Sequence, residues 1–149
     1  MPIHEETRSS RSDRRFHVEL FIVHPTIDPS DITIALGLEA TGSRRVGDRR
    51  MTPKGTVLEG NYPDTRWRHE RQYTVSHQWF ADKVESLVEY LLPHRDLLSR
   101  LSQTREKATL IVQFLGDGYF GDEIPQSTLA KIVDLGLSLS VECFMMPQS

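Results

Sequence analysis

Hydrophobic and polar residues alternate along RFHVELFIVHP, residues 15–25, and this pattern predicts a β-strand. Its apolar face carries Phe16, Val18, Leu20 and Ile22. The opposite face is half polar and carries His17, Glu19, Phe21 and Val23. A strand with one apolar and one mixed face is typical of a sheet interior, and Pro25 ends it because proline cannot donate to the ladder.

The next stretch carries the signals of a short helix. Asp28 is a good N-cap, because its carboxylate accepts from the free N–H groups of the first turn, and Pro29 suits the first helical position. Ile27 and Ile32 are spaced as a hydrophobic staple, and Gly37 supplies a left-handed C-terminal stop. We expect a helix of about two turns that buries Ile32, Ala35 and Leu36.

Residues 39–65 show no clear period, because glycine and proline interrupt every candidate element except a brief strand over residues 56–58. A loop of this length inside a compact domain is usually functional or disordered. The following TRWRHERQYTV, residues 65–75, predicts a strand whose weak apolar signal places it near a sheet edge. One side of that strand carries Trp67, His69, Arg71 and Tyr73.

From Ser76 the period becomes helical. The apolar stripe of the predicted amphipathic helix consists of Phe80, Val84, Leu87, Val88 and Leu91. Ser76 is the expected N-cap, and Pro93 ends or sharply bends the helix. The segment RDLLSRLSQ, residues 95–103, adds a short second helix.

The remaining chain returns to strands. ATLIVQFL, residues 108–115, is apolar on both faces, which is typical of a central strand. After the turn GDGYFGDE we expect a helix with Leu129, Ile132 and Val133 inward and Gly136 as its cap. The closing LSLSVECF alternates and predicts a strand with Leu137, Leu139, Val141 and Cys143 inward.

These elements predict an α+β fold. The economical arrangement is a ferredoxin-like split βαβ sheet of four to five strands, with about three helices mainly on one face. A chain of 149 residues with 38% hydrophobic content forms one domain of ordinary composition. We expect that domain over residues 15–149, after a polar, flexible tail over residues 1–14.

Composition narrows the functional classes. A net charge of −3 favours neither nucleic acid nor a membrane as a partner of the whole molecule. The single cysteine, Cys143, leaves no disulfide framework and fits a reducing cytoplasm. No apolar run approaches the roughly 20 residues that span a bilayer, and the first residues lack a signal-peptide pattern. We therefore expect a cytoplasmic protein.

The charges are unevenly distributed. Residues 42–71 hold eight basic and four acidic side chains, whereas residues 72–149 hold six basic and ten acidic ones. The cations and the aromatic residue that could contact a partner or an anion are Arg44, Arg45, Arg49, Arg50, Lys54, Arg66, Trp67 and Arg68. Guanidinium groups bind phosphate or carboxylate with two parallel hydrogen bonds. The alternative is that these arginines pair with acids of the same chain, above all in its acidic C-terminal half.

Other chemistries have weaker support. Trp67 and Tyr73 alternate with arginines, as in single-strand nucleic-acid binding, but the negative net charge opposes it. His17 and His24 fall on opposite strand faces, and GDGYFGDE lacks the rhythm of a calcium loop, so no metal site is expected. Cys143 is expected in the core, and no nucleophile elbow is present, so no catalytic residue and no cofactor is assigned.

Two stretches resemble a known family. HPTIDPSDITIALGLEATGSRRVGDRRMTPKG and the closing LGLSLSVECF are similar to the bacterial family catalogued as domain of unknown function 4279. The resemblance covers roughly residues 16–145 and implies a fold and a bacterial origin, without an activity or catalytic residues. Ser140 and Glu142 stand where the family pattern suggests acidic residues, and Gly42 interrupts the segment before the arginines.

The sequence therefore favours a non-catalytic binding module. We expect a protein partner, such as a toxin or another subunit of a complex, at the arginine-rich loop. The alternative is an enzyme or sensor that binds a small phosphorylated or carboxylated ligand with the same arginines. A deep pocket lined by two or more of these arginines favours the ligand, and a flat surface favours the protein. The oligomeric state stays open.

Overall fold

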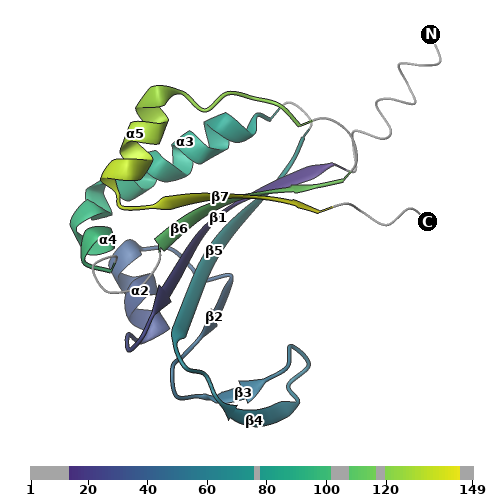
Figure 1. Cartoon of the computed structure of the whole chain (residues 1–149), viewed down its shortest axis with the longest axis vertical. Coiled ribbons are helices and arrows are strands. Elements are labelled where there is room, and N and C mark those ends of the chain that lie inside the picture. The colour runs from purple at the N-terminus through teal and green to yellow at the C-terminus, as the bar shows by residue number, and fades with distance from the viewer. Residues whose placement is uncertain (1–13, 76–77, 102–107, 117–119, 145–149) are drawn as a thin grey trace, which may run out of the picture.

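The computed structural model describes residues 14–75, 78–101, 108–116 and 120–144. A five-stranded sheet has the order β2-β5-β1-β6-β7, and a separate two-stranded hairpin projects from its lower end in Figure 1. The main sheet consists of β1 (Arg15–His24), β2 (Gly42–Arg44), β5 (Thr65–Thr74), β6 (Ala108–Leu115) and β7 (Ser138–Phe144), and the hairpin of β3 (Arg49–Met51) and β4 (Val57–Asn61). All helices of the described chain lie on one face of the main sheet (Figure 1).

The central strand β1 is antiparallel to both β5 and β6. Its alternation is confirmed, since the predicted apolar face is buried: Phe16, Val18, Leu20 and Ile22. The same register places Trp67 of β5 opposite Ile22 and Leu110 of β6 opposite Leu20, all on the helix-bearing face. The strand after the long loop, β5, was expected near an edge of the sheet. On its outer side, β5 pairs only with the three residues of β2 in the described chain, and the rest of β5 forms the edge.

The short helix α2 (Pro29–Leu36) ends as its sequence predicts. The Asp28 carboxylate accepts from the backbone N–H of Ser30 at 3.0 Å. At the other end Gly37 has φ 66°, a left-handed conformation that glycine adopts without a steric cost. A Cβ there would also come within 3.1 Å of the hydroxyl of Tyr90, which donates to the Leu36 carbonyl. Ile32 and Leu36 are buried, but the predicted Ala35 is exposed.

The long amphipathic segment forms α3 (Phe80–Leu91), a 3₁₀ turn η1 (Leu92–His94) and α4 (Arg95–Leu101). Pro93 therefore bends the chain between two helices, as expected. The apolar stripe is confirmed, because Val84, Leu87, Val88 and Leu91 are buried. The N-cap position of α3 is Trp79, so the predicted N-cap Ser76 is wrong. The end of the second predicted helix lies outside the described residues.

The last helix and strand correct two burial predictions. In α5 (Gln126–Asp134) Ile132 is buried, but Leu129 is 40% and Val133 76% exposed. In β7 Leu137, just before the strand, is buried, whereas Leu139 and Val141 are 39% and 62% exposed and Cys143 is exposed. Leu139, Val141 and Cys143 lie on the helix-bearing face beside Leu110, Val112 and Phe114. They remain exposed because β7 is at the edge, where α5 does not cover them.

The α+β class, the five-stranded sheet and the placement of the helices on one face are confirmed. In detail, the sheet is mixed, and the strands of the β6–α5–β7 unit are parallel neighbours with no third strand between them. Within the described ranges, no helix has the length and hydrophobicity needed to cross a bilayer.

Candidate functional site: a basic groove and a projecting arm

Most of the loop over residues 39–65, which showed no clear period, forms two distinct structures. The first, here called the basic groove, is a hollow of about 370 Å³ where β2 and β5 meet the base of the hairpin. It is lined by Gly42, Ser43, Arg44, Met51, Thr52, Pro53, Tyr62, Arg66 and Arg68. Three of the predicted arginines therefore converge. In the antiparallel register of the two strands, Arg44 lies opposite Arg66, and Gly42 lies opposite Arg68.

Like charges that face each other across strands repel, and one carboxylate offsets this repulsion in the basic groove. Asp64 lies 3.2 Å from Nε of Arg66 and 3.9 Å from a terminal nitrogen of Arg44. The Arg44 guanidinium also lies 4.9 Å from the ring centroid of Tyr62. Nε of Arg44 is buried and has no hydrogen-bond partner, so this guanidinium retains unused donors.

The third arginine of the groove reaches a buried carboxylate. Nε of Arg68 lies 3.3 Å from Oε1 of Glu19, whose side chain is only 1% exposed. The same guanidinium lies 4.9 Å from the ring centroid of Phe21, the residue two positions further along β1. Gly42 leaves room for this side chain, because a Cβ there would lie 3.3 Å from Cδ of Arg68.

The second structure, here called the arm, is the β3–β4 hairpin with its turn, residues 48–61. Every residue of the arm except Thr52 is exposed. Among the described residues, its cations Arg49 and Arg50 donate only to backbone carbonyls of Leu58 and Glu59, at 3.2 and 3.4 Å. The arm also exposes three apolar side chains, Met51 at 50%, Val57 at 57% and Leu58 at 37%.

The base of the arm is held by Tyr62 and Thr65. The Tyr62 hydroxyl contacts the N–H and the carbonyl of Met51, and its own backbone pairs with Gly47 and Asp48. The buried hydroxyl of Thr65 donates to the Ile27 carbonyl at 2.6 Å and accepts from the Val46 N–H at 3.0 Å. The arm therefore projects from a fixed base.

Two of the eight predicted contact residues lie elsewhere. Arg45 turns toward α2, where a terminal nitrogen lies 3.6 Å from the Asp28 carboxylate. Trp67 cannot meet a partner, because it is fully buried and its indole N–H donates to the Thr33 hydroxyl at 2.9 Å. Strand alternation turns Trp67 to the helix-bearing face and its neighbours Arg66 and Arg68 to the other. Tyr73, its partner in the predicted stacking surface, stacks on Phe16.

The arginines do pair within the chain, but with different acids from those expected. Their partners Glu19, Asp28 and Asp64 belong to the N-terminal half. The acidic C-terminal half contributes none of them among the described residues. Lys54, at the exposed turn of the arm, forms no ion pair with a described residue.

A polar ladder on the helix-free face was not predicted from the sequence. His17 Nδ1 lies 3.0 Å from Glu70 and 3.3 Å from the Gln113 side-chain oxygen, and Gln113 donates to Glu142 at 3.1 Å. These contacts cross β5, β1, β6 and β7. Burial raises the pKa of Glu19 above its ordinary value; Arg68 opposes this rise, and Glu70 and Glu142 add to it. The alternation of β1 located these positions, but their partners come from distant strands.

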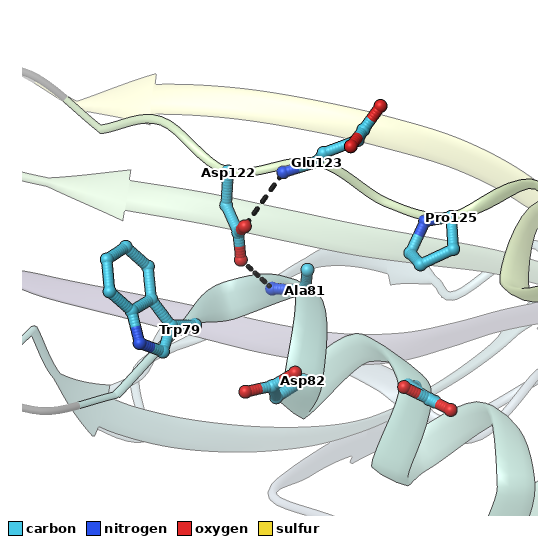
Figure 2. A pocket seen from close by; sticks show the side chains of 7 residues that line it. Trp79, Ala81, Asp82, Asp122, Glu123 and Pro125 are labelled. Atoms are coloured by element: carbon cyan, nitrogen blue, oxygen red, sulfur yellow. Dashed lines mark hydrogen bonds between the residues drawn. The ribbon is translucent and has the colours of Figure 1, made fainter.

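A second hollow, of about 310 Å³, is acidic (Figure 2). It is lined by Trp79, Ala81, Asp82, Glu85, Asp122, Glu123 and Pro125. Asp122 caps α3 from a distant segment, since its carboxylate accepts from the Ala81 N–H at 3.2 Å and from the Glu123 N–H at 2.8 Å. In the described part of the chain, no group of three or more His, Cys, Asp or Glu side chains is arranged to hold a metal ion.

The chain belongs to the family described as Domain of unknown function (DUF4279), whose model matches residues 14–145. The match covers both structures of the candidate site and the whole main sheet. No curated protein and no solved structure matches the chain.

Proposed function

We propose that this protein is a non-catalytic, bacterial and cytoplasmic binding module that contacts an acidic protein partner through the arm. The observation that carries the proposal is the exposure of the arm, which combines three cations with three apolar side chains. An isolated two-stranded hairpin is at best marginally stable, so its exposed apolar side chains add little to this fold. They are suited instead to an interface.

The chemistry of the arm also defines the partner. Met51 and Val57 lie opposite each other across the hairpin and provide the apolar centre that protein interfaces need. The same arm carries Arg49, Arg50 and Lys54, which outnumber its two acids, Asp48 and Glu59, and form no ion pair within the described chain. A partner with an apolar patch and acidic rim, such as a toxin or another subunit of a complex, fits this surface.

A photo-crosslinking residue placed at Leu58 tests this proposal in the organism that makes the protein. We expect a discrete crosslinked product from Leu58 and none from the control position Ile34, which is 79% exposed on α2. The product should disappear when Arg49, Arg50 and Lys54 are replaced by glutamate. A reversal of the exposed Arg15 and Arg100, which form no ion pair within the described chain, should leave it. Equal products from both crosslinking positions would contradict the proposal.

The basic groove favours a second candidate function, the binding of a small phosphorylated or carboxylated ligand. The specific observation is the buried Nε of Arg44, which has no hydrogen-bond partner in a hollow that two further arginines line. Asp64 is shared between Arg44 and Arg66, so donors outnumber acceptors there. An anionic group with several oxygens would satisfy them.

Titration calorimetry with inorganic phosphate and with acetate tests this candidate. We expect phosphate binding that Arg44→Gln with Arg66→Gln abolishes and that Arg49→Gln with Arg50→Gln leaves unchanged. Binding that both pairs weaken equally would indicate a general attraction to positive charge and would reject the groove as a ligand site.

A further inference from the structure

The two edges of the main sheet differ in length and in chemistry. One edge is formed by β2, which has three residues and carries Arg44. The other is β7, seven residues long and paired with β6 alone in the described chain. Edge strands are usually protected from other strands by lysine, proline, a bulge or short length. The segment SLSVECF has none of these devices, and its single charge, Glu142, is bonded to Gln113 of β6.

The backbone of β7 directs half of its polar groups outward. The carbonyl of Phe144 accepts from the Gly116 N–H at 3.3 Å, on the side of β6. Backbone groups alternate in direction along a strand, so the N–H and C=O groups of Glu142 and Ser140 also point toward β6. Those of Leu139, Val141 and Cys143 point away from β6. These outward groups are arranged to pair with a further strand.

The side chains beside this edge are apolar. Leu139, Val141 and Cys143 are exposed on the helix-bearing face of β7. On the same face of the sheet, α5 exposes Leu129 and Val133. Lys131 of α5 pairs with Glu89 of α3, and the flank of α5 that carries Lys131 therefore faces α3. At 100° per residue, Leu129 and Val133 lie on the roughly opposite flank, which faces away from α3 and toward the free edge of the sheet.

We infer that β7 pairs antiparallel with β7 of a second copy of this chain, around a two-fold axis at Val141. Full overlap of residues 138–144 places Val141 opposite Val141 and Leu139 opposite Cys143. The backbone groups of all these residues point outward, so the N–H groups of each strand meet C=O groups of the other. The sole charge of the strand, Glu142, faces Ser140 of the other copy and is held toward β6 by Gln113. No like charges meet in this register.

The same geometry accounts for the apolar flank of α5. A two-fold axis perpendicular to the joined sheets places both copies of α5 on the same face, side by side. Leu129 and Val133 of each copy then face their equivalents, as in the self-complementary interface of a two-fold dimer. This interface uses neither the arm nor the basic groove, so it is independent of the proposed function.

Sedimentation of the full chain between about 1 and 100 µM tests this inference, a range in which weak dimers dissociate. We expect a dimer whose Kd rises at least about tenfold in Val141→Lys, because two lysines would meet at the axis. The matched control Ile34→Lys, at an equally exposed apolar residue of α2, should leave the Kd unchanged. Circular dichroism checks that both variants fold.

Cysteine crosslinking tests the register. Opposed residues of a hydrogen-bonded antiparallel pair have Cα atoms about 5.5 Å apart, within the roughly 4.4–6.8 Å that a disulfide spans. Val141→Cys in a Cys143→Ser background should therefore form a disulfide dimer under mild oxidation. The native Cys143 should not, because the two copies of Cys143 lie four residues out of register, about 13 Å apart. A monomer at every concentration, or a dimer that Val141→Lys does not weaken, would overturn the inference.

Discussion

The arginines of the basic groove and the cations of the arm come from one stretch of sequence, but they have different surroundings. In the groove, Arg66 and Arg68 lie beside carboxylates that the fold holds in place. In the arm, Arg49 and Arg50 are exposed and, within the part of the chain that the structure describes, donate only to backbone carbonyls. The role of each arginine therefore cannot be predicted from its place in an arginine-rich sequence. Burial of the facing acid decides whether a substitution affects stability or binding.

The largest expected effect is at Arg68. Arg68→Met should lower the free energy of unfolding at pH 7 by about 2 kcal/mol, because it leaves the buried Glu19 without an opposite charge. The loss is smaller than for a fully buried pair, since Arg68 is itself 46% exposed. Urea unfolding measures it. The double variant with Glu19→Gln should recover most of the loss; failure to do so would show that Arg68 acts through its packing on Phe21.

The next effect concerns Glu19 itself and depends on pH. Its pKa is raised in the folded protein, so the folded state binds the proton more tightly than the unfolded state. Stability contributed by this group is therefore lost as pH rises from the unfolded value near 4.5 through the raised folded value. Glu19→Gln, which mimics the protonated form, should be more stable than the native chain at pH 7 and equally stable near pH 4. A difference in Tm between Glu19→Gln and the native chain that stays the same at all pH values would contradict this.

A smaller effect is expected at Asp28, which links Arg45 to α2. Asp28→Ala should lower Tm by roughly 2–4 °C through loss of the helix cap. Because the hydrogen bond from Ser30 lowers the pKa of Asp28, this stabilisation is present above the unfolded value of 3.8 and is lost as pH falls below it. Arg45→Gln is the control, and it should change Tm far less. An equal change in both variants would assign the effect to the ion pair.

The smallest effect on stability is expected in the arm. Replacing Arg49, Arg50 and Lys54 by glutamate should change the free energy of unfolding by less than about 1 kcal/mol, because exposed charges contribute little. Replacing Arg44 and Arg66 by glutamate should destabilise more, since both then face Asp64. Thermal melts of the two variants compare the regions directly. A destabilised arm variant would show that its cations are structural.

Local signals predicted a large part of the fold. The cap at Asp28, the stop at Gly37 and the alternation of β1 depend on neighbouring residues, and the structure confirms each of them. The strands β2 and β3 were missed, because three-residue strands have too few positions for a period to show. The site was predicted in part: the arginines were found, but their division between groove, arm and α2 was not.

The failures share one cause. The inward face of β7 was predicted correctly, yet Val141 and Cys143 are exposed because coverage depends on where α5 ends above the sheet. Trp67 looked like a contact residue beside two arginines, but alternation buries it against Thr33 of α2. The ladder through His17, Gln113 and Glu142 joins residues up to about a hundred positions apart and leaves no local pattern.

The sequence by itself determined the local elements, the polarity of each strand face and the concentration of positive charge before β5. These features depend on backbone preferences and on periods of a few residues. Both are properties of short stretches of sequence and do not require the rest of the fold. The tertiary structure decided which carboxylate meets which arginine, and which apolar face is covered. Both are properties of pairs distant in sequence. Burial of Glu19 beside Arg68 and exposure of Val141 at the sheet edge therefore became visible only in the folded chain.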